Sequence, residues 1–182
     1  MTDRTSLPPV TLVLGGARSG KSRYAEQLVE GRPGDCIYLA TAEARDVEMA
    51  HRIEVHRARR GKRWATVEAP LDLVKALNAH CRPGAAVLVD CLSLWLSNQI
   101  GEGRDPLRES EALVSALPTL GGPVVFVSNE VGLGIVPDNE LARHFRDHAG
   151  YLHRAVAAAA QSVALVVAGL PLKLKPAEET IP

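Results

Sequence analysis

The segment that decides the fold is Val10-Thr11-Leu12-Val13-Leu14-Gly15-Gly16-Ala17-Arg18-Ser19-Gly20-Lys21-Ser22. Residues 10–14 are mostly apolar and β-rich and predict a buried strand, while residues 22–30 have the apolar spacing of a helix. Between them, the chain satisfies the pattern G-x-x-x-x-G-K-[ST] without a mismatch. In a strand–loop–helix setting, the backbone N–H groups of such a loop surround phosphate oxygens and the helix dipole adds positive potential. The stretch therefore predicts a site for a nucleoside triphosphate.

The loop itself supplies the first candidate site residues. We expect nucleotide contacts from all of its members: Gly15, Gly16, Ala17, Arg18, Ser19, Gly20, Lys21 and Ser22. Lys21 is expected to reach the β- and γ-phosphates, and the Ser22 hydroxyl is expected to bind Mg²⁺. A plain glycine-rich turn is the alternative, and the flanking strand and helix argue against it.

Outward from this loop, short apolar runs alternate with helical patterns. Further strands are predicted at residues 36–40, 85–89, 123–128 and 163–168, and further helices at 46–60, 71–79, 106–117 and 139–161. Continuous apolar strands separated by helices indicate a parallel sheet that is covered on both faces. The predicted fold is α/β, a three-layer P-loop NTPase with a mostly parallel central sheet. We expect one catalytic domain at 10–175, a flexible lead at 1–9 and a tail at 176–182.

Composition excludes several other classes of protein. The 182 residues contain 21 Lys+Arg and 21 Asp+Glu, and this zero balance argues against a nucleic-acid binder that acts through bulk charge. Cys36, Cys81 and Cys91 form no C-x-x-C pair, so they predict neither a disulfide framework nor a zinc site and suit a reducing compartment. No apolar stretch approaches the ~20 residues of a membrane span, and residues 1–10 do not resemble a signal peptide. A cytoplasmic protein without stable membrane insertion is expected.

Two acidic residues follow predicted strands and are candidates for the chemistry. Asp90 comes after the apolar run 85–89, where P-loop enzymes place an acid that holds Mg²⁺ directly or through water. The less favoured alternative is that Asp90 is the N-cap of a helix starting near Leu92. Glu130 follows the strand at 123–128, and a turn role for it is about as plausible as a chemical one.

The most basic part of the chain contains a histidine. Residues 52–64 hold six Lys or Arg residues around His56, which borders the apolar stripe of the predicted helix 46–60. A half-buried helix histidine on a solvated basic face is one interpretation. In the other, the arginines collect phosphate charge and His56 acts on phosphorus as a nucleophile or acid/base. His144 and His148 are spaced to share a metal, but no third ligand is evident, so a metal site there is not favoured.

Several segments together resemble the bifunctional adenosylcobinamide kinase / adenosylcobinamide-phosphate guanylyltransferase family. Besides residues 15–22, these are Tyr-Leu-Ala-Thr-Ala at 38–42, Arg-Ile-x-x-His-Arg at 52–57, Val-Asp-Cys-Leu at 89–92 and Asn-Glu-Val-Gly-x-Gly-Ile-Val-Pro at 129–137. The resemblance runs from about Thr11 to Lys175. A P-loop alone is shared with many functions, whereas the 129–137 string and the histidine segment are far more particular.

The resemblance implies a RecA-like fold and two reactions. A nucleoside triphosphate, ATP or GTP, phosphorylates adenosylcobinamide, and a histidine then takes GMP from GTP and passes it to adenosylcobinamide phosphate. The family histidine maps onto His56, which makes His56 and Lys21 the implied catalytic residues. Nucleotide contacts beyond the P-loop are implied at Thr41, Ala42, Glu43, Arg57, Ala58, Arg59, Arg60, Glu68 and Asp90. Mg²⁺ is implied as cofactor, at Ser22 and Asp90, and so is a homotrimer.

Two other functions remain open at this point. A small-molecule P-loop kinase would use the loop and Asp90 without a nucleophilic histidine. A nucleotide-dependent switch is disfavoured, because the chain contains no Asn-Lys-x-Asp segment for guanine and the Asp147–Gly150 D-x-x-G string lies inside a helical pattern. Trp64, Trp95 and the run 170–174 are candidates for a subunit interface or for the core.

Overall fold

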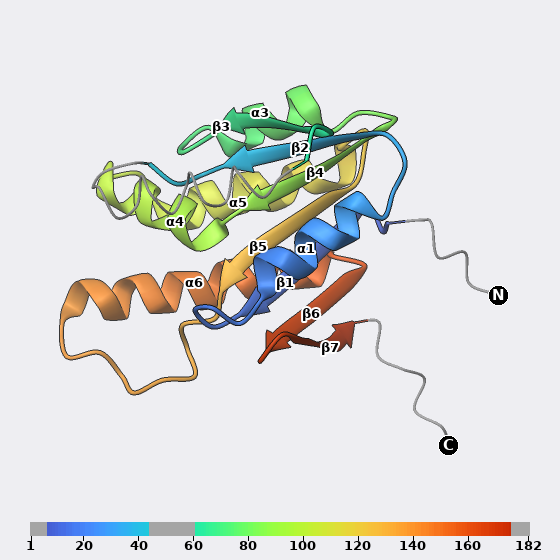
Figure 1. Ribbon diagram of the computed structural model, residues 1–182. Helices are drawn as coiled ribbons and strands as arrows, with labels where there is room; N and C mark the ends of the chain where they lie inside the picture. Colours follow the sequence, from blue (N-terminus) through green and yellow to red (C-terminus); the bar gives the residue numbers. More distant parts are fainter. Residues whose placement is uncertain (1–6, 44–60, 176–182) are drawn as a thin grey trace, which may run out of the picture.

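A single sheet of seven strands organises the part of the chain that this computed structural model describes, residues 7–43 and 61–175 (Figure 1). The strands are β1 (Val10–Gly15), β2 (Asp35–Ala40), β3 (Trp64–Glu68), β4 (Ala85–Asp90), β5 (Val124–Asn129), β6 (Ser162–Val167) and β7 (Leu170–Lys175). Their order across the sheet is β3-β2-β4-β5-β1-β6-β7. Neighbouring strands pair in parallel except β7, which turns back antiparallel to β6. The mostly parallel α/β sheet is therefore confirmed.

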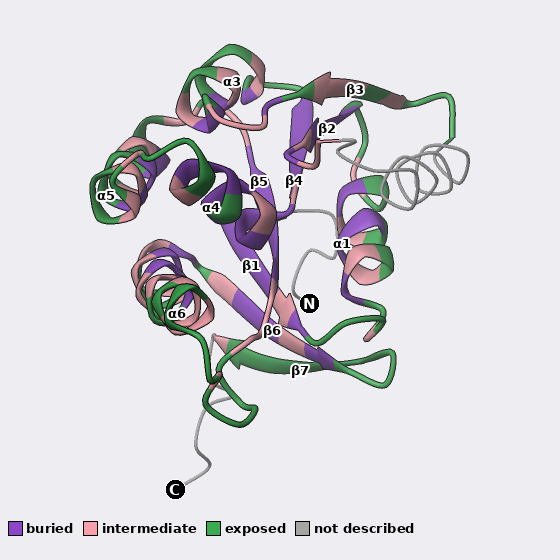
Figure 2. Ribbon diagram, turned by 90° about the vertical axis from the view of Figure 1, so that its left-hand side faces the viewer, coloured by how far each residue is buried: buried purple, intermediate pink, exposed green. Residues whose placement is uncertain are grey.

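Helices cover both faces of this sheet, as the three-layer prediction requires. They are α1 (Lys21–Glu30), α3 (Leu73–His80), α4 (Leu92–Gly101), α5 (Pro106–Ala116) and α6 (Glu140–Ala159), with a short 3₁₀ turn at Leu117–Thr119. Figure 2 shows α1 on one face and α3 to α6 on the other. Alternate strand residues fill the two cores, so Leu12 packs towards α6 and its neighbour Val13 towards α1. No helix in the described ranges is both long enough and apolar enough to cross a membrane.

Local sequence explains where two of the long helices begin. Asp105 caps α5, with its Oδ1 accepting from the backbone N–H groups of Leu107 and Arg108, and Pro106 occupies the first helical position. Asn139 caps α6 in the same way through the N–H of Ala142, at 2.7 Å. Both helices lie within two residues of the predicted bounds.

Three elements escaped the sequence prediction. The edge strands β3 and β7 are short and partly or fully exposed, and α4 is an apolar helix of ten residues that follows β4 almost directly. The predicted helix at 46–60 lies outside the described residues, as do residues 1–6 of the expected lead and the expected tail.

The sequence left open whether Trp64, Trp95 and residues 170–174 belong to the core or to a subunit interface. The structure answers this for Trp95. Trp95 belongs to the core, with 1% of its surface exposed and its indole N–H bound to the carbonyl of Leu71 at 2.9 Å. Leu170, Leu172 and Leu174 are all exposed on β7. Trp64 is half-buried on β3 and donates to Glu30 Oε1.

Parallel pairing brings the predicted site residues to one edge of the sheet. Gly15 is in register with Asn129, and Ala40 is in register with both Glu68 and Asp90. These residues end β1, β5, β2, β3 and β4, so the loops that follow them meet at the carboxyl edge, where ligands of such folds bind.

Candidate nucleotide-binding site

The glycine-rich loop joins β1 to α1 in a conformation that requires glycine at two positions. Gly20 has φ +95°, a left-handed conformation that residues with a Cβ rarely adopt, and a Cβ there would lie 3.2 Å from the Cα of Gly169. At Gly15, a Cβ would lie 2.6 Å from the carbonyl oxygen of Val166. The turn between β6 and β7 also contacts the glycine-rich loop: Gly169 N–H donates to the Ser19 carbonyl at 2.8 Å and so helps to fix the loop conformation.

The Lys21 side chain folds back over this loop. Its Nζ donates to the carbonyl of Gly16 at 3.1 Å, and only 9% of the residue is exposed. The fold therefore holds the ammonium group against the loop, close to where the loop would bind a phosphate. The first N–H groups of a helix have no intrahelical acceptor, and α1 begins at Lys21, so its N-terminus adds further donors.

Ser19 offers an unused polar group inside the same loop. Its Oγ is buried, and within the described ranges no hydrogen-bond partner lies near it. Leaving a buried hydroxyl without a partner costs about 1–3 kcal/mol. A phosphate oxygen or a metal-bound water at this place would remove that cost, which is the behaviour expected of a site built for an anion.

Asp90 ends β4 with its carboxylate at the carboxyl edge. Its Oδ2 accepts a hydrogen bond from the Tyr38 hydroxyl at 2.9 Å, across from the neighbouring strand β2. The alternative role of Asp90 as a helix cap is wrong, because the N-cap of α4 is Cys91 and no side chain caps that helix. Sequence reasoning missed Tyr38, since its contact with Asp90 depends on β2 and β4 being neighbours and leaves no local signal.

A buried polar network fixes the backbone beside Asp90. The Thr41 hydroxyl accepts from Cys91 N–H at 2.7 Å and donates to the Cys91 carbonyl at 2.8 Å. The Asn98 amide donates to the Thr41 carbonyl at 2.8 Å, which ties α4 to the end of β2. Ser93 Oγ accepts from the Asn129 amide at 3.0 Å, which ties α4 to the end of β5. Thr41 is fully buried, and its hydroxyl is used within the protein.

The remaining predicted contacts fall into two groups. Ala42 and Glu43 follow β2, and the exposed Glu68 ends β3 beside them. From β3 to β1 there are four strand spacings, about 19 Å. If Glu68 and the P-loop both contact one nucleotide, they must therefore contact opposite ends of it. Asp90, on β4, lies between them. His56, Arg57, Ala58, Arg59 and Arg60 lie outside the described residues.

Glu130 performs the turn role that the sequence left open. Its Oε1 accepts from Gly132 N–H at 2.6 Å and its Oε2 accepts from Leu133 N–H at 3.2 Å. Its own N–H donates to the Gly15 carbonyl at 3.0 Å, so the chain after β5 is attached to the start of the P-loop.

Two histidine contacts lie on α6. The Nε2 atoms of His144 and His148 are 2.9 Å apart, and burial lowers the pKa of His148, with the neighbouring His144 charge acting in the same direction. Within residues 7–43 and 61–175, no three His, Cys, Asp or Glu side chains are grouped as metal ligands.

His153, also on α6, was not singled out from the sequence. Its Nε2 lies 2.7 Å from Ser128 Oγ, and burial lowers its pKa to about 4.

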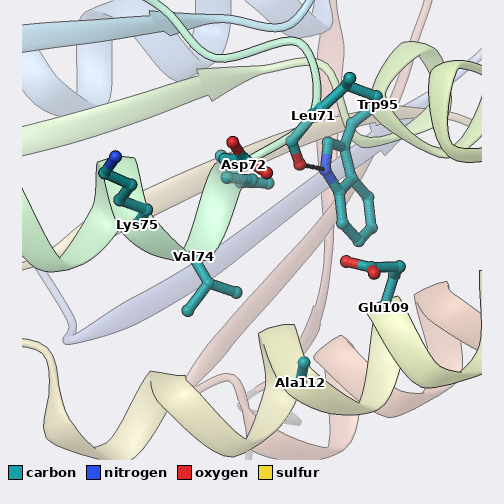
Figure 3. Close-up of a pocket in the computed structure, with 8 residues that line it drawn as sticks. Leu71, Asp72, Val74, Lys75, Trp95, Glu109 and Ala112 are labelled. Atoms are coloured by element: carbon teal, nitrogen blue, oxygen red, sulfur yellow. Dashed lines mark hydrogen bonds between the residues drawn. The ribbon is translucent and has the colours of Figure 1, made fainter. Parts of the chain in front are cut away.

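A surface hollow of about 300 Å³ lies away from these residues, between α3, α4 and α5 (Figure 3). Leu71, Val74 and Ala112 line it together with Trp95, whose indole N–H is bound to Leu71, and Asp72, Lys75 and Glu109 add charge. None of the predicted site residues lines this hollow. The loops at the carboxyl edge therefore stay the candidate site.

A P-loop on a three-layer, mostly parallel sheet, with a buried lysine and an acid on a nearby strand, defines the class: a nucleotide-using P-loop enzyme. Comparison with known proteins narrows this class. A family model described as CobU, cobinamide kinase / cobinamide phosphate guanyltransferase, matches residues 11–174, and the chain belongs to this family. This confirms the resemblance seen in the sequence.

Curated relatives agree over nearly their whole length. The chain is 50% identical over 167 residues to the bifunctional adenosylcobalamin biosynthesis protein CobP of Pseudomonas aeruginosa, covering 90% of this chain and 96% of that protein. It is 42% identical over 179 residues to the bifunctional adenosylcobalamin biosynthesis protein CobU of Escherichia coli, covering 90% and 98%.

Solved structures match the fold. An ATPase from the type III secretion system of pathogenic bacteria has a TM-score of 0.57 at 12% identity, over 90% of this chain and 56% of that chain. A Pyrococcus horikoshii OT3 protein studied as PH0250 has a TM-score of 0.58 at 9% identity, over 97% and 91%. At such low identity these matches are evidence for the fold alone. They confirm the predicted RecA-like P-loop architecture.

Proposed function

We propose that this enzyme phosphorylates adenosylcobinamide with ATP or GTP and then transfers GMP from GTP to adenosylcobinamide phosphate, giving adenosylcobinamide-GDP. The observation that carries the nucleotide chemistry is the preformed loop, with Lys21 held over it at 3.1 Å from the Gly16 carbonyl. Family membership supports the corrinoid acceptor and the second reaction. One catalytic domain, residues 10–175, carries both.

In the kinase reaction, the P-loop holds the phosphates of the donor. The oxygen of the acceptor hydroxyl attacks the γ-phosphorus, its proton is released, the bond to the β–γ bridging oxygen breaks, and the nucleoside diphosphate leaves. Lys21 and the α1 N-terminus offset the charge that develops on the phosphate oxygens. Because the fold holds Lys21 on the Gly16 carbonyl and places the start of α1 at the loop, little reorganisation is needed at the moment of reaction.

Ser22 and Asp90 carry a hydroxyl and a carboxylate, oxygen ligands of the kind that Mg²⁺ prefers. Ser22 is the second residue of α1. The Asp90 carboxylate has its Oδ2 bound by Tyr38, so we assign its Oδ1 to the metal or to a metal-bound water. Mg²⁺, when bound, offsets phosphate charge. Tyr38 orients the carboxylate through its hydroxyl, which donates to Oδ2.

In the guanylyltransferase reaction, His56 is the nucleophile. A neutral imidazole nitrogen attacks the α-phosphorus of GTP, pyrophosphate leaves, and GMP stays on the histidine as a phosphoramidate. A phosphate oxygen of adenosylcobinamide phosphate then attacks the same phosphorus, and the histidine is released. We assign guanine-nucleotide contacts to Thr41, Ala42, Glu43, Arg57, Ala58, Arg59, Arg60, Glu68 and Asp90. The buried Thr41 hydroxyl would act through the backbone of Cys91.

We further propose that the protein works in the cytoplasm as a homotrimer, without nucleic-acid partners. The formal charge of zero and the free, buried cysteines agree with this setting. Sedimentation velocity on the purified full chain measures the oligomeric state directly.

The test of the proposal uses GTP labelled at the α-phosphate. The wild-type protein with Mg²⁺ is expected to acquire label that survives alkali but not acid, and none from γ-labelled GTP. His56→Asn should abolish the label, whereas His144→Asn, a matched change on the exposed part of α6, should keep it. If a protein that binds GTP acquires no label from the α-position, the simple-kinase alternative replaces this proposal.

A further inference from the structure

The loop after β5 exposes an uncharged apolar surface. Residues 131–137, Val-Gly-Leu-Gly-Ile-Val-Pro, contain no charged group in a chain in which 23% of residues are charged. Leu133 is 82% exposed, Ile135 97% and Val136 57%. We call this segment the apolar loop. Three large aliphatic side chains so close in sequence and so open to water form a surface suited to binding.

Hydrogen bonds at both ends hold the apolar loop in place. The Glu130 carboxylate accepts from the N–H groups of Gly132 and Leu133 at its start. At its end, the Arg143 guanidinium donates to the carbonyls of Pro137 and Asp138, at 3.0 and 2.6 Å. Because both ends are fixed by charged side chains, the loop presents its aliphatic groups without a large ordering cost on binding.

The apolar loop begins beside the phosphate site. Asn129 is in register with Gly15, and Glu130 N–H donates to the Gly15 carbonyl at 3.0 Å. In Figure 1 the loop runs from the end of β5 to α6 at the same end of the sheet as the β1–α1 connection. A substrate resting on it would lie next to the phosphates held by the P-loop.

We propose that the apolar loop binds the corrinoid acceptor and positions its aminopropanol arm at the P-loop. This inference rests on the proposed function. A cobinamide-type ring is large, carries methyl groups and has neutral amides at its periphery, so exposed aliphatic side chains and backbone amides complement it better than charges would. The acceptor hydroxyl must reach the γ-phosphorus, and the attachment of Glu130 to Gly15 provides that nearness.

The experiment compares Leu133→Ser/Ile135→Ser with the wild-type protein. The control is Leu172→Ser, the same chemical change at an aliphatic residue that is 58% exposed on the edge strand β7. All of these side chains are exposed, so folding is not at stake. Three quantities are measured: label from α-labelled GTP without acceptor, the acceptor concentration dependence of GMP transfer, and equilibrium dialysis of cobinamide. Sedimentation velocity is run on each variant.

The expected result separates the two half-reactions. GMP loading should stay within twofold of wild type, whereas the apparent KM for the acceptor and the dialysis Kd for cobinamide should rise about tenfold or more. The control should match wild type in all measurements. Unchanged acceptor KM and Kd overturn the inference. So does a loss of binding that accompanies a change in oligomeric state, which would assign the loop to contacts between copies of the chain.

Failure of the proposed function has a different signature. In that case the wild-type protein itself acquires no label from the α-position of GTP. Dialysis still decides the inference then, because it needs no transfer: cobinamide binding by wild type that the double substitution weakens supports the apolar loop as the corrinoid site, and no binding by wild type refutes it.

Discussion

Acidification should destabilise this protein through one buried histidine. His153 lies on α6 against β5, with Nε2 2.7 Å from Ser128 Oγ, and burial lowers its pKa from 6.5 to about 4 while Glu130 opposes that shift. The unfolded chain binds a proton near pH 6.5, but the folded chain does not until about pH 4. Stability is therefore lost as the pH falls from 6.5 to 4, and it is unaffected by His153 above that range.

The magnitude follows from the width of this interval. Each pH unit between the two pKa values contributes about 1.4 kcal/mol, so the total loss is about 3 kcal/mol. Since domains of this kind have a free energy of unfolding of about 5–15 kcal/mol, such a loss is a substantial part of the whole.

The variant His153→Gln isolates this contribution. Glutamine keeps an amide that can bond Ser128 Oγ but does not titrate. Urea unfolding at pH 7.5, 6.5, 5.5 and 4.5 gives the free energy of unfolding of both proteins, and the stability of wild type relative to the variant should fall by about 2.5 kcal/mol between pH 7.5 and 4.5. The ring-proton NMR signal of His153 should titrate near pH 4. Parallel pH curves for the two proteins, or a titration near pH 6.5, would refute the reasoning.

Three further changes test the carboxyl edge. Tyr38→Phe removes the hydroxyl that donates to the carboxylate ending β4, and Mn²⁺–nucleotide binding followed by EPR should weaken about fivefold to tenfold; an unchanged Kd contradicts this role. Thr41→Val leaves both backbone groups of Cys91 without their buried partner and should cost about 2–4 kcal/mol in urea unfolding, with a loss under 0.5 kcal/mol as the contrary result. Gly20→Ala forces a Cβ at φ +95° and should lower Tm by about 3–8 °C, whereas Gly16→Ala, where a Cβ meets nothing within 4 Å, should not; equal shifts would rule out backbone strain.

Much of the fold was accessible from the sequence because its signals are local. The P-loop dictates the strand before it and the helix after it, and α6 carries an N-cap at Asn139 and a regular apolar stripe. The edge strand β3 carries no such signal: its five residues are at most half-buried, so neither alternation nor a continuous apolar run marks them. In β7, Pro171 and two lysines interrupt the apolar pattern, and only the turn at Gly169 reverses its direction.

The site was predictable to the extent that it follows strand ends. Gly15 and Asp90 could be placed at one edge, since parallel strands share their carboxyl ends. The strand order that sets β2 beside β4 could not be read from local patterns, and with it the contact of Tyr38 with Asp90 stayed hidden. The same reason explains why the buried bonds of Thr41 to Cys91 were not foreseen.

The hydrogen bonds around Asp90 indicate that the fold itself orients its carboxylate, without a bound ligand. Tyr38 holds one carboxylate oxygen from β2, and Thr41 holds both backbone groups of the next residue, Cys91. Asn98 in turn holds the carbonyl of Thr41 from α4, so a rotation of the Asp90 backbone would break several buried hydrogen bonds at once. Because each unsatisfied buried group costs about 1–3 kcal/mol, the alternative orientations lie well above the observed one. An acid fixed in this way can act on a metal–nucleotide complex with little loss of conformational entropy, which is the advantage of a preorganised site.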